Sequence, residues 1–189
     1  MENLFIIKDK ALLRCKDINY SGTVIIPEGV ENIGFEAFKL CANVAEIKLP
    51  STLKRIGNLA FYGSGITSIQ IPSNCTLVED GAFMSCPALK ELMLPEGLDV
   101  ISEGLVCYCE SLKKVVIPSS VKTIEEGAFS GCSNLKSVVF KGVIDKIGPV
   151  AFEDCENLQE IDIPFGCKEI GYAAFRVVAH LNAFFFLIR

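Results

Sequence analysis

"VKTIEEGAFSGCSNLKSVVF", residues 121–140, contains a Gly-Ala-Phe triplet, a cysteine three residues after the phenylalanine, a leucine three residues later and then an apolar run. The arrangement recurs along the chain with a period of 23 residues and one deletion. Six of the eight prolines follow this period, at Pro27, Pro50, Pro72, Pro95, Pro118 and Pro164. Phenylalanines follow it too, at Phe38, Phe61, Phe83, Phe129, Phe152 and Phe175, with Val106 in the one slot that lacks a phenylalanine. A fixed period of this length indicates a solenoid.

The repeat unit combines two kinds of periodicity. It can be written I-x-I-P-x-x-V-x-x-I-G-x-x-A-F-x-x-C-x-x-L-x-x, and it occurs about seven times from residue 24 onward. Apolar residues alternate just before each proline, as Ile69 and Ile71 do, which predicts a short half-buried strand that the proline closes. The stretch from I-G to L spaces its apolar residues nearer the helical period and predicts a turn or two of α-helix or 3-10 helix. We therefore expect a repeat solenoid of the α/β class.

This unit resembles that of the BspA-like leucine-rich repeat family, whose repeat has the same I-P, I-G-x-x-A-F-x-x-C and L positions; the resemblance covers residues 24–186. It implies a right-handed superhelix with one parallel β-sheet on the concave face and short helical or 3-10 segments on the convex face. The opening FIIKDKALLRC resembles the N-terminal β-hairpin cap of the family. We expect one leucine-rich repeat domain over residues 1–189, with this cap at 1–23, about seven repeats of 22–23 residues at 24–182 and a C-terminal strand at 183–189.

The composition argues against several classes of protein. Half of the residues are hydrophobic and the mean hydropathy is +0.41, yet no apolar stretch approaches the ~20 residues that span a bilayer. The net charge is -5, from 18 basic and 23 acidic residues, and the chain shows no basic stripe that would attract nucleic acid. The N-terminal sequence has no basic segment followed by a long apolar one, so we expect no secretory signal in it. Neither a membrane span nor a nucleic-acid partner is expected.

The cysteines are interpreted mainly as packing residues. Five of the nine share one slot of the repeat, which Val178 fills in the last coil: Cys41, Cys86, Cys109, Cys132 and Cys155. A buried free thiol behaves as a small hydrophobe, whereas a thiolate metal site needs ligands that converge at short spacing. Disulfides or a metal remain the alternative, but we expect no metal and no cofactor. Alternation along the chain predicts that one of Cys107 and Cys109 points inward and the other outward.

Catalysis is not expected from this pattern. The single histidine, His180, would need an exposed thiol beside it to form a nucleophilic pair. The carboxylates Asp80, Glu126 and Asp145 fall at variable positions of the repeat, where nothing pairs two of them across a cleft. Each glycine occupies a repeat slot, so no phosphate-binding loop is indicated. We predict that the chain is not an enzyme and has no catalytic residues.

Binding is expected at the outward positions of the predicted sheet, two and four residues before each proline slot, because these side chains vary without harming the core. Our candidate protein-binding residues on the concave face are Glu91, Met93, Lys114, Val116, Ser137, Val139 and Glu160. Met93, Val116 and Val139 would form an apolar strip on three neighbouring strands, rimmed by charged residues. The alternative interpretation is that exposed valines simply suit a β surface.

The C-terminal sequence LNAFFFLIR suggests a second contact surface. Phe184 and Phe186 fall in the strand slots of an eighth ladder position, after which no polar cap follows in the sequence. Three explanations fit an uncapped edge strand: tail-to-tail dimerisation, truncation of a longer array, and phenylalanines that fold back as an improvised cap. We favour association or the improvised cap, so these two residues are a candidate homodimer edge.

Two functions of different classes fit these observations. The first is a non-enzymatic protein–protein interaction module; the family resemblance implies adhesion at a bacterial cell surface, with matrix or cell-surface proteins as partners. The second is an intracellular scaffold, favoured by the absence of a recognisable signal and by the many unpaired cysteines, which suit a reducing compartment. The two imply different locations, cell surface or cytoplasm.

Overall fold

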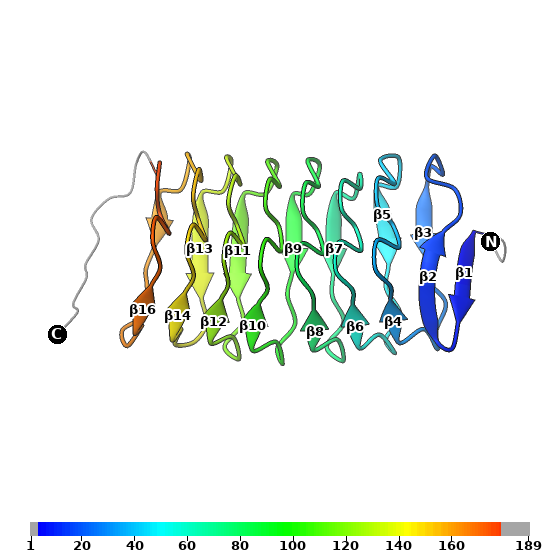
Figure 1. The fold of residues 1–189 in the computed structure, drawn as a ribbon, viewed down its shortest axis with the longest axis horizontal. Helices are drawn as coiled ribbons and strands as arrows, with labels where there is room; N and C mark the ends of the chain where they lie inside the picture. The colour runs from blue at the N-terminus through cyan, green and yellow to red at the C-terminus, as the bar shows by residue number, and fades with distance from the viewer. Residues whose placement is uncertain (1–3, 179–189) are drawn as a thin grey trace.

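The chain winds into a β-solenoid in the computed structural model, which describes residues 4–178. Figure 1 shows the coils side by side along one axis, with the hairpin of β1 (Phe5–Lys8) and β2 (Ala11–Cys15) at one end and β16 (Glu169–Ile170) at the other. Each coil has three sides: a strand before the proline slot, a two-residue strand at the I-G slot, and a series of turns that carries the A-F-x-x-C positions. The repeat solenoid predicted from the spacing is confirmed.

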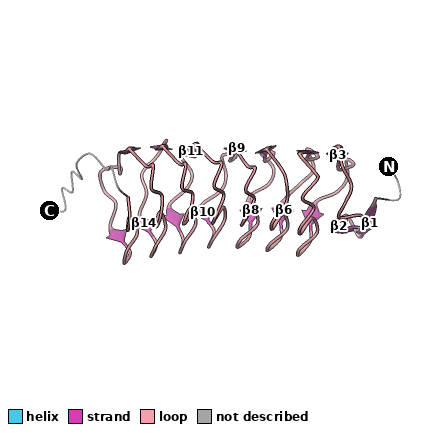
Figure 2. Ribbon diagram, turned by 90° about the horizontal axis from the view of Figure 1, so that it is seen from above, coloured by secondary structure: helices cyan, strands magenta, loops and turns pink. Residues whose placement is uncertain are grey.

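The strands before the proline slots form what we call the proline-side ladder: β3 (Thr23–Ile25), β5 (Glu46–Lys48), β7 (Ser68–Gln70), β9 (Glu91–Met93), β11 (Lys114–Ile117), β13 (Ser137–Phe140) and β15 (Glu160–Ile161). The strands at the I-G slots form the glycine-side ladder: β4 (Asn32–Ile33), β6 (Arg55–Ile56), β8 (Leu77–Val78), β10 (Val100–Ile101), β12 (Thr123–Ile124), β14 (Lys146–Ile147) and β16 (Glu169–Ile170). β1 (Phe5–Lys8) and β2 (Ala11–Cys15) form an antiparallel hairpin, and β2 starts the glycine-side ladder by pairing in parallel with β4. The view in Figure 2 places β9 and β11 along one edge and β8 and β10 along the other.

Successive strands of a ladder pair in parallel and in register. In the proline-side ladder Ile69 pairs with Leu92, and Val115 pairs with Val138. These inward positions are buried, while the positions on either side of them in each strand are exposed or half-buried. The predicted half-buried strand is therefore confirmed, and its inward face contributes to one continuous core along the axis.

The predicted helical segments, and with them the α/β class, are wrong: residues 4–178 contain no helix. Within residues 34–41 the N–H groups of Ala37 and Lys39 bond to carbonyls three residues back. The N–H groups of Phe38 and Leu40 instead bond to carbonyls of the next coil. Because alternate N–H groups point along the axis, no helical run of hydrogen bonds can form, and left-handed backbone at Leu40 (φ 58°) breaks the local turn as well.

The prediction of a single sheet is incomplete as well. The glycine-side ladder adds a second set of parallel pairings, and its two-residue strands are too short to show a period of two in the sequence. In both views the coils stack in a nearly straight array rather than around a marked concavity (Figures 1 and 2). We therefore name the proposed binding surface the proline-side face, meaning the outward side chains of the proline-side ladder. The handedness of the winding stays a prediction.

Both ladders are interrupted at the fourth coil, which contains β9 and β10. β9 is bonded back to β7 and β10 forward to β12, but in the described residues no ladder joins β8 to β10 or β9 to β11. The turn side stays bonded across this point: the Phe83 N–H donates to the Leu105 carbonyl at 2.9 Å. The Ser102 hydroxyl also donates to the Val78 carbonyl. A turn-side backbone bond and a side-chain bond at the glycine slot thus join the two halves of the solenoid where the sheets separate.

The phenylalanines of the A-F slot stack on one another inside the turn side. Phe38, Phe61 and Phe83 form one stack, and Phe129, Phe152 and Phe175 form another, with ring centroids 5.0–5.3 Å apart and rings within 8° of parallel. Val106, which is fully buried, lies between the two stacks in the fourth coil. The aromatic stack and the two ladders are therefore interrupted at the same coil.

The recurring cysteine fills space and also donates a hydrogen bond. In each case the Sγ–H donates to the carbonyl of the phenylalanine-slot residue one coil back, at 3.0–3.2 Å; the thiols are those of Cys86, Cys109, Cys132 and Cys155. Ser64 takes this slot in the second coil, where it is fully buried with its Oγ 3.4 Å from Cys86 Sγ. All nine cysteines are free. The slot therefore takes a small side chain, and in these four coils the thiol adds a hydrogen bond to a carbonyl of the preceding coil.

Burial raises the pKa of several of the buried thiols, whereas a hydrogen bond with Cys109 lowers the pKa of Cys86. Desolvation raises the pKa of Cys155 to about 12, and desolvation, followed by the neighbouring Cys15, raises that of Cys41 to about 12. Burial also raises the pKa of Cys132 well above its ordinary value. These thiols stay protonated at neutral pH, which makes them poor nucleophiles and poor metal ligands.

The fourth coil offers a test of stack continuity. Val106→Phe alone should overpack the core beside Leu105, and Leu105→Ala alone should leave a cavity, each lowering the free energy of unfolding by about 1–4 kcal/mol. The double variant restores the Ala-Phe pair of the other coils and should lie within about 1.5 kcal/mol of wild type, since the summed volume is nearly conserved. Urea unfolding of the four proteins measures this coupling. Additive losses in the double variant would contradict it.

Alkaline destabilisation offers a test of the buried thiols. Between about pH 9 and pH 12 an unfolded Cys155 loses its proton while the folded one keeps it, so the free energy of unfolding falls by about 1.4 kcal/mol per pH unit. Cys155→Val, which places at this slot the residue found at Val178, should remove that contribution and make the stability fall less steeply from pH 8 to pH 10. Urea unfolding in a reducing buffer measures both slopes. Cys167→Val, at a half-buried thiol, is the control and should change the slope less; parallel slopes for wild type and Cys155→Val would show that this thiol does not titrate as described.

Candidate functional site

The proline-side face presents two columns of outward side chains. The first column is Thr23, Glu46, Ser68, Glu91, Lys114 and Ser137, followed by the backbone position of Glu160, and the second is Ile25, Lys48, Gln70, Met93, Val116, Val139 and Asp162. The pairing register aligns them, since Lys114 pairs with Ser137 and Val116 with Val139. Glu160 is aligned with Ser137 on the next strand. The candidate residues chosen from the sequence thus occupy consecutive positions of two columns.

The second column is apolar over the middle coils. Met93 is 46% exposed and Val116 38% exposed, while Val139 is half-buried. Val116 and Val139 lie on hydrogen-bonded strands, but Met93 lies on β9, the last strand of the preceding sheet. Figure 1 shows β9 and β11 as neighbours, so the strip crosses the point where the ladder is interrupted.

The polar groups of this face differ between its two ends. Near the N-terminus the Thr23 hydroxyl donates to Glu46 Oε2 at 2.7 Å, and Lys48 Nζ lies 3.8 Å from Glu46 Oε1. Glu91 and Lys114 beside the apolar strip have no ion-pair partner among the described residues. The charges at the middle of the face are therefore available to a partner, while those at its start are already engaged.

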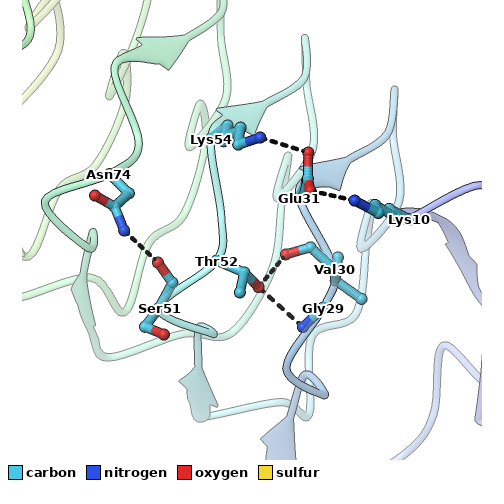
Figure 3. A network of polar contacts seen from close by, with 8 residues as sticks. All are labelled: Lys10, Gly29, Val30, Glu31, Ser51, Thr52, Lys54 and Asn74. Atoms are coloured by element: carbon cyan, nitrogen blue, oxygen red, sulfur yellow. Dashed lines mark hydrogen bonds and ion pairs between the residues drawn. The ribbon is translucent and has the colours of Figure 1, made fainter.

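Carboxylates on another edge have a structural role (Figure 3). Glu31 accepts from Lys10 Nζ and from Lys54 Nζ, each at 2.7 Å, and so joins the hairpin to the first two coils. These two ammonium groups lower the pKa of Glu31 to about 2. Nearby, the Gly29 N–H donates to Thr52 Oγ1, whose hydroxyl donates to the Val30 carbonyl. Such groups hold coils together and are not free for a ligand.

The proline turns contain a second structural contact that sequence reasoning missed. Glu28 accepts from the backbone and the hydroxyl of Ser51 at 3.0 and 3.1 Å, which lowers the pKa of Glu28. Glu96 accepts from Ser119 in the same way, at 3.2 and 3.0 Å, in the fourth and fifth coils. The signal is a Pro-Glu-Gly turn followed one repeat later by Pro-Ser.

Among the described residues, the side chains considered for catalysis or metal binding do not come together in one site. Within residues 4–178 no group of three or more His, Cys, Asp or Glu side chains is arranged to hold a metal ion. Asp145 is engaged with Lys168 at 2.8 Å. Cys107 and Cys109 are both buried, so neither is an exposed thiol. Cys109 belongs to the core, whereas Cys107 lies outside the core cluster and faces the turn-side surface, as the predicted inward and outward directions require. His180, Phe184 and Phe186 lie outside the described residues.

The turn side carries a depression that the sequence pattern did not indicate to us. Its volume is about 350 Å³, and it extends over the turns of the second to the sixth coil. Asp80 and Glu126, which we had treated only as scattered carboxylates, line it. Three glycines at one slot of successive coils, Gly81, Gly104 and Gly127, are the signal that could have located it.

No helix of the described residues is long and apolar enough to cross a bilayer. Solved structures share the fold. A leucine-rich repeat protein from Eubacterium ventriosum has a TM-score of 0.81 at 24% identity over 98% of this chain, and the Treponema pallidum leucine-rich repeat protein one of 0.82 at 29% over 91%. A leucine-rich repeat protein from Bacteroides ovatus has a TM-score of 0.63 at 23% identity over 90%. The chain spans 53%, 82% and 58% of those three proteins respectively.

A comparison with curated protein sequences gives no significant match. The profile described as BspA type leucine rich repeat region matches this chain in six copies, over residues 5–132 and 101–187. The match covers the same coils in which the I-P, I-G and A-F slots stack in register. The chain therefore belongs to the BspA-type leucine-rich repeat family.

Proposed function

We propose that the chain is a non-enzymatic protein-binding module that uses its proline-side face for adhesion-type binding of a matrix or cell-surface protein. The family suggests a protein-interaction module, and repeats of this kind typically lack enzymatic activity. The observation that carries the proposal is the strip of Met93, Val116 and Val139, whose apolar side chains are presented to solvent beside unpaired charges. An apolar centre with a charged rim is the usual composition of a protein-binding patch.

The charged residues beside the strip support a role in specificity. Glu91 and Lys114 carry opposite charges on adjacent coils, and neither is engaged by an ion pair within residues 4–178. A partner with the complementary pair of charges would be steered into register and would satisfy both groups. Ser137 and Glu160 continue this column toward the C-terminal coils.

An intracellular scaffold is the second candidate function, and the nine free cysteines favour it. Thiols that are left unpaired suit a reducing compartment. The buried slot thiols weaken this point, because a thiol of raised pKa that is shielded by the core resists oxidation in any compartment. The adhesin and the scaffold would both use the proline-side face, and they differ in the protein that this face binds.

The strip can be tested by placing charge in it. Val116→Glu together with Val139→Glu should reduce binding to immobilised matrix proteins by about tenfold or more, because two carboxylates would be desolvated at the centre of the patch. The melting temperature should change little, since Val116 is partly exposed and Val139 half-buried. Binding is measured on plates coated with extracellular matrix proteins and, in parallel, by capture from whole-cell lysate.

Leu77→Glu with Val143→Glu is the matched control, because these two residues are exposed apolar side chains off the proline-side face. It should leave binding nearly unchanged. Equal losses in both double variants would assign the effect to net charge, and unchanged binding by the Val116 and Val139 variant would remove the strip from consideration. Capture from lysate alone would favour the scaffold over the adhesin.

A further inference from the structure

The depression on the turn side lies away from the proline-side face and offers a surface of different chemistry. Its floor is open because of the backbone at one slot. That slot has left-handed backbone in every coil, and it is occupied by Leu59 and Val150 at the two ends of the depression and by glycine in the three coils between them. A Cβ placed on Gly104 would meet nothing nearer than the Cys107 Cβ at 3.8 Å. Gly104 and Gly127 therefore leave a floor of bare backbone, whereas the Leu59 side chain lies over Gly81, where a Cβ would be 2.7 Å from Leu59 Cδ2.

The floor is mainly apolar. Leu59, Met84 and Val150 contribute to the lining. Cys107 and Ser130 line it as well, although only 8% and 7% of their surfaces are exposed. These two polar side chains therefore present their small remaining surface to the depression, where a bound group would cover it.

The rim is acidic. Asp80, Glu103 and Glu126 occupy the same slot of three successive coils, so their backbone positions are one ladder step apart, about 4.8 Å. All three are exposed, and none forms an ion pair with a described residue. Other carboxylates of the solenoid are matched with a cation one coil away, as Glu79 is with Arg55 and Glu153 with Arg176. Stacked like charges repel each other unless a cation lies between them.

We propose that this depression binds an extended basic segment of a partner protein, with arginine or lysine side chains as the anchoring groups. A long basic side chain lays its aliphatic stem on an apolar surface and keeps its charged head at a polar edge. The floor over Gly104 and Gly127 would take the stem, and Glu103 and Glu126 would take the head. Arginine fits best, because a guanidinium can bind carboxylates in a bidentate manner.

The proposal is independent of the proline-side face and can be tested with a defined probe. The probe is a fluorescein-labelled hexapeptide of alternating arginine and alanine, and its counterpart has citrulline, which keeps the shape without the charge, in place of arginine. Fluorescence anisotropy with the full chain should show saturable binding of the arginine peptide that is about tenfold or more tighter than that of the citrulline peptide. Raising the salt concentration should weaken it, since the rim is exposed.

Two variants separate charge from shape. Glu103→Lys with Glu126→Lys should weaken binding of the arginine peptide about tenfold or more, whereas Glu110→Lys with Glu156→Lys, the same charge change at exposed sites outside the depression, should weaken it less than about twofold. Gly104→Leu fills the floor with the side chain that Leu59 presents at the same slot, and it should weaken binding while every carboxylate is kept. Met84→Trp fills the same space from a half-buried position and replaces Gly104→Leu if that variant does not fold.

Three outcomes would overturn the proposal. The first is no saturable binding of the arginine peptide up to millimolar protein. The second is an equal loss in the two lysine pairs, which would mean attraction to the net charge of the chain. The third is full binding by the filled variants, which would mean that the carboxylates act without the depression. Binding of the peptide that survives Val116→Glu with Val139→Glu would confirm that the two surfaces are separate.

Discussion

In-register stacking of coils is the constraint on which the rest of this structure depends. Apart from the ladder interruptions at the fourth coil, backbone hydrogen bonds run along the axis on all three sides of the coils, so residues lie over their counterparts one repeat later. A side chain at an inward slot must therefore pack against a copy of itself. Parallel phenylalanine rings and the row of slot thiols follow directly from that requirement. In the fourth coil the ring is replaced by the smaller Val106, and the larger Leu105 beside it keeps the summed volume nearly the same.

Stacking also explains what could be predicted from the sequence. The period, the inward slots and the strand before each proline were readable because a slot must keep its residue type in every coil. The turn side was not readable as turns, since its apolar spacing of three to five residues is shared by a short helix and by a series of turns that bond to the next coil. Hydrogen bonds of Phe38 and Leu40 to the next coil decide between the two, and a partner one coil away has no signal in a single repeat. The glycine-side ladder was missed for a similar reason, because a strand of two residues has no measurable period.

The candidate binding sites were harder to predict, because outward slots, unlike inward ones, do not have to keep their residue type. The sequence therefore identifies which positions face solvent but not which of them bind. The pairing register shows which of these positions are neighbours, since it aligns Val116 with Val139 on hydrogen-bonded strands. The depression follows from the backbone at one slot, which is left-handed at Leu59, Gly104 and Val150 alike. Side chains fill this slot at the two ends of the depression, and glycine leaves it empty in the middle. The sequence shows that each glycine occupies a repeat slot, but it does not show that three glycines in successive coils open the surface.

The fourth coil lies beneath both candidate binding surfaces. Both ladders end there, yet the turn side stays bonded through it, and both candidate surfaces pass over it: Met93 and Val116 lie on either side of the proline-side interruption, and Gly104 lies in the floor of the depression. Where ladder bonds are absent, the relative position of two coils is set by fewer contacts and is the least costly to adjust. A partner that contacts both sides of such a point gains contact area without breaking a ladder. Its binding would then depend on how the two halves of the solenoid meet at this coil.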